Sequence, residues 1–152
     1  MGKQLTKVRG FVRGALHDTV TGETRMGDWH ENVITQIGFQ NFLCYNLITD
    51  ASGLHPTHIA IGSSADAHAS TDTTCGGQWS PRAAVTASVS ASQTARFVAS
   101  WASSQVTGKI ACCALHHATA TTSGSAMCIA TYTASTKSDT QTFTLTYDIA
   151  FA

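Results

Sequence analysis

The sequence predicts a mainly β fold, an antiparallel β-sandwich of jelly-roll-like type with an N-terminal β-hairpin and one α-helix. Two observations support this prediction. From residue 82 onward, five β-like segments are separated by turn-forming Ser, Thr and Gly at the interval typical of sandwiches and jelly rolls. Only one stretch, residues 36–49, places apolar residues convincingly at helical spacing. The length of 152 residues suits a single domain, so we expect one domain over residues 1–152.

The N-terminal third predicts a hairpin followed by the helix. Residues 5–34 contain two β-like segments on either side of the turn-forming Thr21-Gly22-Glu23. Thr35 is a candidate N-cap for the helix, because its hydroxyl can accept a hydrogen bond from a free N–H of the first turn. The apolar residues of the predicted helix are Ile37, Phe39, Phe42, Leu43, Leu47 and Ile48.

The sandwich strands are predicted within residues 57–151. Residues 57–64 read as a short buried strand, and the small, polar and glycine-bearing residues 65–81 read as a long surface loop. The last strand has the clearest alternation. Its apolar face consists of Phe143, Leu145, Tyr147, Ile149 and Phe151.

The low charge of the chain argues against nucleic acid and anionic membranes as partners. Charged residues make up 12% of the chain and the formal net charge is zero, against a usual charged content of about 25%. The chain therefore lacks the basic field that holds nucleic acid or an anionic membrane, and it has no run of about 18 apolar residues that could span a bilayer. A surface with so few charges is poorly protected against association, so we expect part of it to be buried in an assembly. Without a signal-peptide pattern, synthesis is expected in the cytoplasm.

The densest group of potential metal ligands is KIACCALHHA, residues 109–118. On a β-strand, Cys112 and His116 lie on one face about 13 Å apart, and Cys113 and His117 lie on the other. Zinc holds its ligands at about 2.0–2.3 Å, so one strand cannot bring either pair to a single metal, whereas a helix could. Gly108 before the segment and a second β-like run after it favour a strand. We therefore predict no metal or cofactor here, with a site shared with another segment or subunit as the alternative.

Reduced and buried thiols are expected for a chain with no export signal. A tight hairpin would bring Cys113 close to Cys128, so a Cys113–Cys128 disulfide is the bridge to test. A vicinal Cys112–Cys113 bridge would force an unusual peptide geometry. The cysteines are Cys44, Cys75, Cys112, Cys113 and Cys128.

No catalytic motif is found in the sequence. It contains no nucleophile elbow, no zinc-protease helix motif, no P-loop and no dinucleotide fingerprint, and its nine acidic residues are scattered. We therefore predict that the protein is not an enzyme. Trp79, in the long loop, and Trp29 are candidate interface residues, because Trp is over-represented at interfaces. Trp101 lies in an alternating strand and is expected in the core.

Several short motifs follow one another in a characteristic order. They are Thr21-Gly22-Glu23, residues 32–38, residues 59–64, residues 71–74, Arg82 and residues 142–151. This order resembles a group of small virion proteins of tailed bacteriophages, described as head-decoration, tail-fibre or baseplate-associated proteins. The chain departs from the group at Cys112-Cys113-Ala114-Leu115, where an acidic residue commonly leads into a Gly-Leu pair, and at Cys75, where a leucine is common.

The resemblance implies a non-enzymatic structural protein of a phage virion, made in the host cytoplasm. Our leading hypothesis is a capsid decoration or cement protein that binds the major capsid protein and copies of itself, as a homotrimer, and stabilises the shell. The N-terminal hairpin or the long loop would serve as the arm that reaches a neighbour. The alternative is a tail-fibre, baseplate or receptor-binding module that binds a host receptor.

Overall fold

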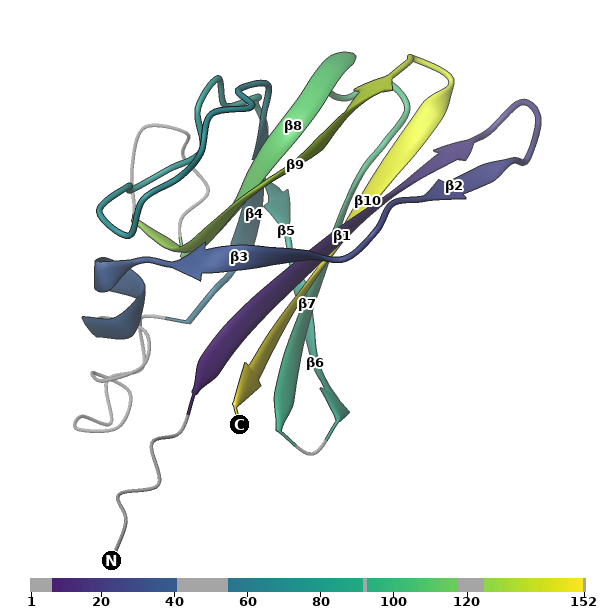
Figure 1. Ribbon diagram of the computed structural model, residues 1–152. Coiled ribbons are helices and arrows are strands. Elements are labelled where there is room, and N and C mark those ends of the chain that lie inside the picture. Colours follow the sequence, from purple (N-terminus) through teal and green to yellow (C-terminus); the bar gives the residue numbers. More distant parts are fainter. Residues whose placement is uncertain (1–6, 41–54, 92, 118–124, 152) are drawn as a thin grey trace, which may run out of the picture.

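A computed structural model describes residues 7–40, 55–91, 93–117 and 125–151, and these residues form ten β-strands (Figure 1). The short strands are β2 (Thr24–Met26), β3 (His30–Ile34), β4 (His58–Gly62), β5 (Ala83–Ala84) and β6 (Thr86–Ala91). The long strands are β1 (Val8–Asp18), β7 (Thr94–Trp101), β8 (Gly108–His116), β9 (Ala126–Lys137) and β10 (Gln141–Phe151). The prediction of a mainly β fold is confirmed.

All of the strand pairs are antiparallel. The order across the sheet is β5-β4-β8-β9-β3-β1-β10-β7-β6, with β2 paired to the outer part of β1. Strand β3 pairs with β1 through Asn32 and with β9 through Val33, so it joins the two halves into one sheet. The predicted antiparallel arrangement is therefore confirmed, while the sandwich and jelly-roll details are not.

One short segment, residues 83–91, nearly closes this sheet into a barrel. Its first part, β5, pairs with β4, and its second part, β6, pairs with β7. At the junction the Val85 N–H donates a hydrogen bond to the Thr57 carbonyl at 3.0 Å. The two end strands of the sheet, β5 and β6, thus belong to a single stretch of chain. One edge of β6 nevertheless stays unpaired in the described structure, and all residues of β6 are exposed.

The core fills the inside of this barrel. The predicted apolar face of β10 is confirmed, because Phe143, Leu145, Tyr147 and Ile149 are buried and Phe151 packs against them. Trp101 is fully buried, as expected, and its indole N–H donates to the Pro81 carbonyl at 3.0 Å. The interior is thus built from inward side chains of strands from both halves of the sheet.

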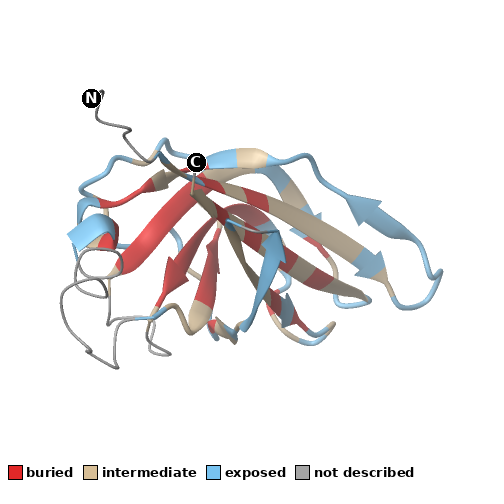
Figure 2. Cartoon of the chain, turned by 90° about the horizontal axis from the view of Figure 1, so that it is seen from below, coloured by how far each residue is buried: buried red, intermediate tan, exposed pale blue. Residues whose placement is uncertain are grey.

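The hairpin region ends in an exposed tip. Strands β1 and β2 pair across a turn in which the Asp18 carboxylate accepts hydrogen bonds from the backbone N–H groups of Val20 and Thr21. Gly22 has a φ of 75°, which glycine adopts without a steric penalty. Residues 19–29 are all exposed, and we call them the arm. Figure 2 shows the turn and β2 projecting from the body of the molecule.

The predicted N-cap is confirmed. Thr35 is buried; its hydroxyl accepts a hydrogen bond from the Gly38 N–H at 2.8 Å and donates one to the Ala126 carbonyl at 2.6 Å. Helical structure begins at residue 36 and continues to residue 40. The remainder of the predicted helix, residues 41–49, lies outside the described residues. No helix in the described part of the chain is long and apolar enough to cross a membrane.

Candidate functional site

The segment KIACCALHHA contributes β8, so the predicted strand is confirmed. Strand β8 lies between β4 and β9, and its consecutive cysteines face opposite sides of the sheet. Cys113 points into the barrel interior, whereas Cys112 lies on the outer side in a small cluster with Cys75, Ala60 and Ala114. The alternation of this strand therefore separates the two thiols into different environments.

The inner thiol, that of Cys113, contacts Tyr147 in the core. The sulfur of Cys113 lies 3.0 Å from the Tyr147 hydroxyl, which donates a hydrogen bond to the Cys113 carbonyl, also at 3.0 Å. Burial raises the pKa of Cys113 well above its usual value, and burial also raises the pKa of Cys128. Both groups therefore remain protonated thiols at neutral pH.

The possible Cys113–Cys128 disulfide is not formed in this structure, in which both residues are free and buried thiols. Cys113 lies opposite Ala130, and Cys128 lies opposite Leu115, so the two cysteines are diagonal neighbours. Diagonal residues of an antiparallel pair lie about 7–8 Å apart, beyond the usual Cα separation of about 4.4–6.8 Å in a disulfide.

The outer thiols meet where the loop of residues 65–81 passes over β4 and β8. Cys75 in this loop is 1% exposed and Cys112 is fully buried. A Cβ placed on Gly62 would lie 2.9 Å from the Cys112 sulfur and 3.3 Å from the Cys75 sulfur, so both sulfurs pack over this glycine. The Cys112 thiol also donates a hydrogen bond to the Gly76 carbonyl at 3.3 Å. The loop is thus held against the barrel partly by sulfur contacts.

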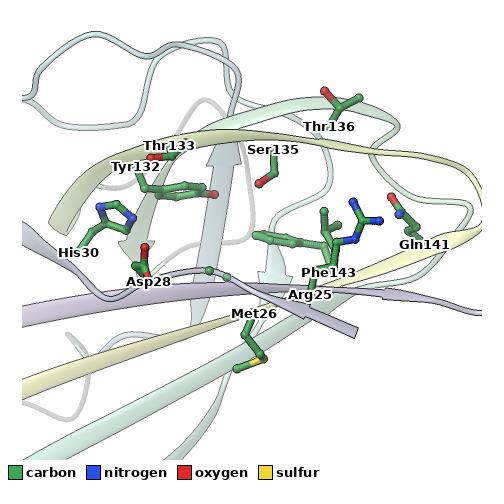
Figure 3. Close-up of a pocket in the computed structure, with 13 residues that line it drawn as sticks. Arg25, Met26, Asp28, His30, Tyr132, Thr133, Ser135, Thr136, Gln141 and Phe143 are labelled. Atoms are coloured by element: carbon green, nitrogen blue, oxygen red, sulfur yellow. The ribbon is translucent and has the colours of Figure 1, made fainter. Parts of the chain in front are cut away.

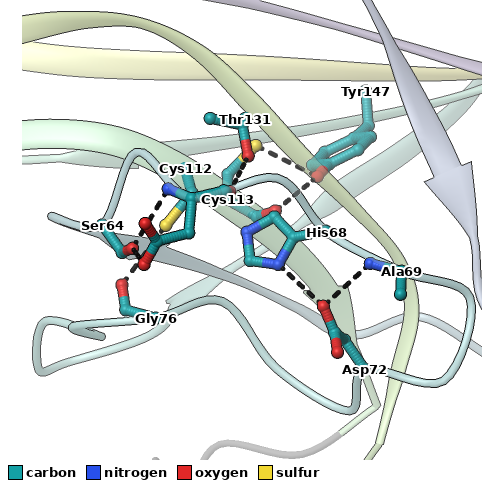
Figure 4. A network of polar contacts seen from close by, with 10 residues as sticks. Ser64, His68, Ala69, Asp72, Gly76, Cys112, Cys113, Thr131 and Tyr147 are labelled. Atoms are coloured by element: carbon teal, nitrogen blue, oxygen red, sulfur yellow. Dashed lines mark hydrogen bonds and ion pairs between the residues drawn. The ribbon is translucent and has the colours of Figure 1, made fainter.

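A histidine and an aspartate complete this cluster (Figure 4). His68 Nδ1 lies 3.1 Å from the Asp72 carboxylate, which also accepts a hydrogen bond from the Ala69 N–H at 3.0 Å. The His68 side chain is 7% exposed. Its other ring nitrogen, Nε2, is buried without a hydrogen-bond partner and points toward Cys112. We call Cys75, Cys112, His68 and Asp72 the outer thiol cluster.

The cluster shifts the acidity of its members. The hydrogen bond with Cys75, and then the proximity of the His68 imidazole, lower the pKa of Cys112 to about 7 against the opposing effect of burial. The shared hydrogen bond and burial raise the pKa of Cys75 well above its usual value. The Ala69 N–H and then His68 lower the pKa of Asp72, which keeps this carboxylate ionised. The arrangement therefore favours one thiolate, at Cys112.

The two histidines of the segment do not join the thiols. His116 is fully buried and lies opposite His58 in the β4–β8 pair. Burial, and then the charge of Arg82, lowers the pKa of His116 to about 3. His117 is half-buried beside it. Among the described residues, no group of three or more His, Cys, Asp or Glu side chains could hold a metal ion.

A pocket of about 410 Å³ opens between the arm and β9 (Figure 3). The ring of Tyr132 lines it beside His30, with ring centroids 6.0 Å apart, and the buried Tyr132 hydroxyl has no hydrogen-bond partner. Its other lining residues are Gly14, Leu16, Arg25, Met26, Gly27, Asp28, Thr133, Ser135, Thr136, Gln141 and Phe143. Because these residues come from five strands and a connection, their proximity could not be inferred before the sheet order was known.

The two candidate interface tryptophans have different environments. The Trp79 indole N–H donates to the Lys109 carbonyl at 2.9 Å, and its half-buried ring packs against the core. Trp29 is 41% exposed, with the Arg13 guanidinium 4.6 Å from the centre of its ring. Trp79 therefore helps to fix the loop to β8, while Trp29 offers the larger free surface.

Sequence reasoning did not find the outer thiol cluster. The sequence predicts a long surface loop over residues 65–81 and marks Cys75 as a departure from the motif pattern. A weak signal was present, since His68 and Asp72 are four residues apart in a loop that also contains a cysteine. No protein-family model, characterised protein or solved structure matches the chain.

Proposed function

We propose that the protein is a non-enzymatic structural component of a tailed-bacteriophage virion, specifically a capsid decoration or cement protein. The observation that carries this proposal is the exposed arm on a nearly closed barrel. Val20 is 76% exposed, Met26 is 56% exposed and Trp29 is 41% exposed. Exposed apolar side chains gathered on a projecting segment are typical of a surface that becomes buried against a partner.

The proposed mechanism is mechanical. The arm docks on the major capsid protein, and burial of its apolar side chains adds contact area that stabilises the shell. The ion pair between Arg25 and Glu23 in the arm is solvent-exposed and adds little to this contact. Many copies on one particle multiply a modest contact through avidity.

The open edge of β6 supports contact between copies of the chain. All six residues of β6 are exposed, and its sequence TASVSA contains no charged residue and no proline. Proteins commonly protect free strand edges with such residues, so an unprotected edge is a template for pairing with another strand. We therefore propose a homotrimer.

We also propose that the fold is a jelly-roll-like sandwich, with β1, β10, β7 and β6 in one layer and β4, β8 and β9 in the other.

The arm can be tested by substitution. The double change Val20→Asp and Met26→Asp places two charges at the docking surface. We expect binding of this variant to capsids from which the protein is missing to fall at least roughly tenfold, because each new carboxylate loses its hydration when the surface is buried. Co-sedimentation with capsids measures this loss. Ser104→Asp, an exposed change between β7 and β8, is the matched control and should bind as the wild type does. Equal binding of both variants would contradict the role of the arm.

The place in the virion is tested separately by locating and counting copies on purified particles. Hundreds of copies over the shell are expected for a cement protein. A few copies at the tail tip would overturn the cement proposal and favour the second candidate, a receptor-binding module of a tail fibre or baseplate.

One observation favours that second candidate. The pocket of about 410 Å³ is concave and combines the aromatic Tyr132 with polar side chains, among them Arg25 and Asp28. Pockets of this kind commonly bind small ligands such as the sugars of a host receptor. In this role the arm would form one wall of the binding site.

A further inference from the structure

We propose that Cys75 and Cys112 form an oxidisable thiol pair, which a peroxide converts into a disulfide that ties the loop of residues 65–81 to β8. The geometry assigns Cys112 as the thiol that attacks the peroxide, Cys75 as the thiol that resolves the product, and His68 as the group that carries the proton. This inference does not depend on the place of the protein in a virion.

The two sulfurs of the pair lie close together over Gly62. Both sulfurs lie about 3 Å from the position that a Gly62 Cβ would take, at 2.9 and 3.3 Å. They therefore share the space that any side chain larger than glycine would fill. Both belong to the same small buried cluster on the outer side of the sheet. Cys75 belongs to a loop, whereas Cys112 lies in a central strand.

His68 supplies the second and independent observation. Its side chain is 7% exposed, and its buried Nε2 has no hydrogen-bond partner although it points toward Cys112. A buried ring nitrogen without a partner is costly unless it serves the neighbouring group. Asp72 holds the opposite nitrogen at 3.1 Å and so fixes the orientation of the ring. The order of groups is thiol, imidazole and carboxylate, as in sites that activate a cysteine.

The electrostatic surroundings agree with this geometry. The pKa of Cys112 is lowered to about 7, so a substantial fraction is thiolate at neutral pH, and the thiolate is the reactive form. Several other groups face the pair: Cys113 raises the pKa of Cys75, the Ser64 N–H lowers that of Cys112, and Arg82 and Tyr132 interact with Cys75. The Asp66 carboxylate belongs to the same network, because it accepts a hydrogen bond from the Ser64 hydroxyl at 2.6 Å.

Burial decides which reaction is feasible. Cys112 is fully buried, so a macromolecular substrate cannot reach its sulfur, and the arrangement does not fit a hydrolase acting on a protein or a glycan. Hydrogen peroxide is little larger than water and can enter when the covering loop opens locally. The second thiol is already in place beneath that loop, so the reaction between the two thiols is intramolecular and is favoured by proximity.

The chemistry balances with hydrogen peroxide as the oxidant. His68 accepts the Cys112 proton, the thiolate attacks one peroxide oxygen, and the O–O bond breaks to give a sulfenic acid and hydroxide. The hydroxide takes the proton from His68 and leaves as water. The sulfur of the Cys75 thiol then attacks the Cys112 sulfur, its proton passes to the departing hydroxide as the S–O bond breaks, and a second water leaves. Two thiols and one peroxide thus give one disulfide and two molecules of water.

Mass spectrometry of the full chain tests the proposal. After treatment of the reduced protein with hydrogen peroxide, the intact mass should fall by two hydrogen atoms. Trypsin should then release residues 26–82 linked to residues 110–137, since Arg25, Arg82, Lys109 and Lys137 are the cleavage sites that bound them. The oxidised protein should also melt at a higher temperature than the reduced protein, because the bridge constrains the unfolded chain.

Single substitutions identify the two sulfurs within these peptides. Cys75→Ser and Cys112→Ser should each abolish the linked peptides. Cys44→Ser, Cys113→Ser and Cys128→Ser are matched controls, because they remove the other cysteines of the same two peptides, and the link should persist in them. Circular dichroism of each reduced variant confirms that it is folded before oxidation.

His68→Asn separates activation from packing. We expect disulfide formation at pH 7 to slow at least roughly tenfold in this variant, because Cys112 loses the imidazole that accepts its proton. The midpoint of the rate against pH should move from near 7 toward the usual thiol value of about 8.5. A purely structural histidine would change the melting temperature and leave this midpoint unchanged.

Three results would overturn the proposal. The folded wild type could resist peroxide without loss of mass, the link could persist in Cys112→Ser, or the link could disappear in Cys113→Ser or Cys128→Ser while those variants remain folded. None of these results bears on the cement proposal, which is tested by capsid binding and copy number.

Discussion

The two faces of β8 place neighbouring cysteines in opposite chemical situations. Cys113 faces the barrel interior, where burial raises its pKa and the Tyr147 hydroxyl lies against its sulfur. Cys112, the adjacent residue, faces the loop of residues 65–81, where Cys75 and His68 lower its pKa. Both sulfurs are fully buried, so exposure does not explain the difference.

The difference teaches that neighbouring groups can offset the effect of burial on the acidity of one thiol and fail to do so for the next. In the interior, burial penalises the Cys113 thiolate more than the Tyr147 hydroxyl and the Ala130 backbone can stabilise it. Under the loop, a hydrogen-bond donor and an imidazole lie close enough to stabilise the same charge. One face of β8 therefore contributes mainly to stability, and the other offers reactivity.

The largest expected effect is the loss of stability when a side chain on the interior face of β8 is removed. Leu115→Ala removes a fully buried side chain from the interior face and should lower the free energy of unfolding by about 2–5 kcal/mol. Cys112→Ala removes one buried group on the outer face and should cost only about 1 kcal/mol. Urea unfolding of the reduced proteins measures both values. Equal losses would mean that the outer cluster supports the fold as strongly as the core does.

The last residue of β8, His116, is a buried base whose pKa is also shifted by its surroundings. Burial and Arg82 lower the pKa of His116 to about 3, whereas in the unfolded chain it is about 6.5. Below pH 6.5 the unfolded chain binds a proton that the folded protein does not bind until about pH 3. The contribution of neutral His116 to the free energy of unfolding is therefore fully present above pH 6.5 and is lost as the pH falls from 6.5 toward 3. The expected loss between pH 7 and pH 5 is roughly 2 kcal/mol.

Unfolding at the two pH values, in the wild type and in His116→Leu, isolates this contribution. The variant should lose less stability on acidification, because it lacks the buried imidazole. An identical pH dependence would show that His116 does not carry the effect.

The smallest expected effect concerns the hydroxyl that holds the inner thiol. Tyr147→Phe removes the hydrogen bond to the Cys113 carbonyl and should lower the free energy of unfolding by about 0.5–1.5 kcal/mol. Tyr132→Phe is the matched control, because the buried Tyr132 hydroxyl has no hydrogen-bond partner and its removal should be neutral or slightly stabilising. Denaturant midpoints distinguish the two variants, and a larger loss from Tyr132→Phe would reverse this assignment.

The local features of the fold could be predicted from the sequence. Alternation marked the buried face of β10, and the position of Thr35 before an apolar helical pattern marked the N-cap. Both features depend on residues that are close together in the chain. The closure of the sheet could not be predicted, because it depends on one segment, residues 83–91, pairing with two strands that are distant in sequence.

The candidate site divides in the same way. The strand character of KIACCALHHA could be predicted, and with it the separation of Cys112 from Cys113. The meeting of Cys75 with Cys112 could not, because it depends on the path of a long loop over the outer face of the sheet. The register of β8 and β9 was likewise undetermined, and it places Cys128 diagonal to Cys113 instead of directly opposite.

The place of β10 has a consequence for how the protein is made. This strand pairs along its whole length with β1, from Val8 opposite Phe151 to Asp18 opposite Gln141, and on its other side with β7. While the ribosome is still synthesising residues 141–151, both of those strands lack a neighbour and the barrel interior lacks one wall. Folding must therefore finish after translation of β10. Pairings this distant in sequence form slowly and leave apolar edges open to aggregation in the meantime.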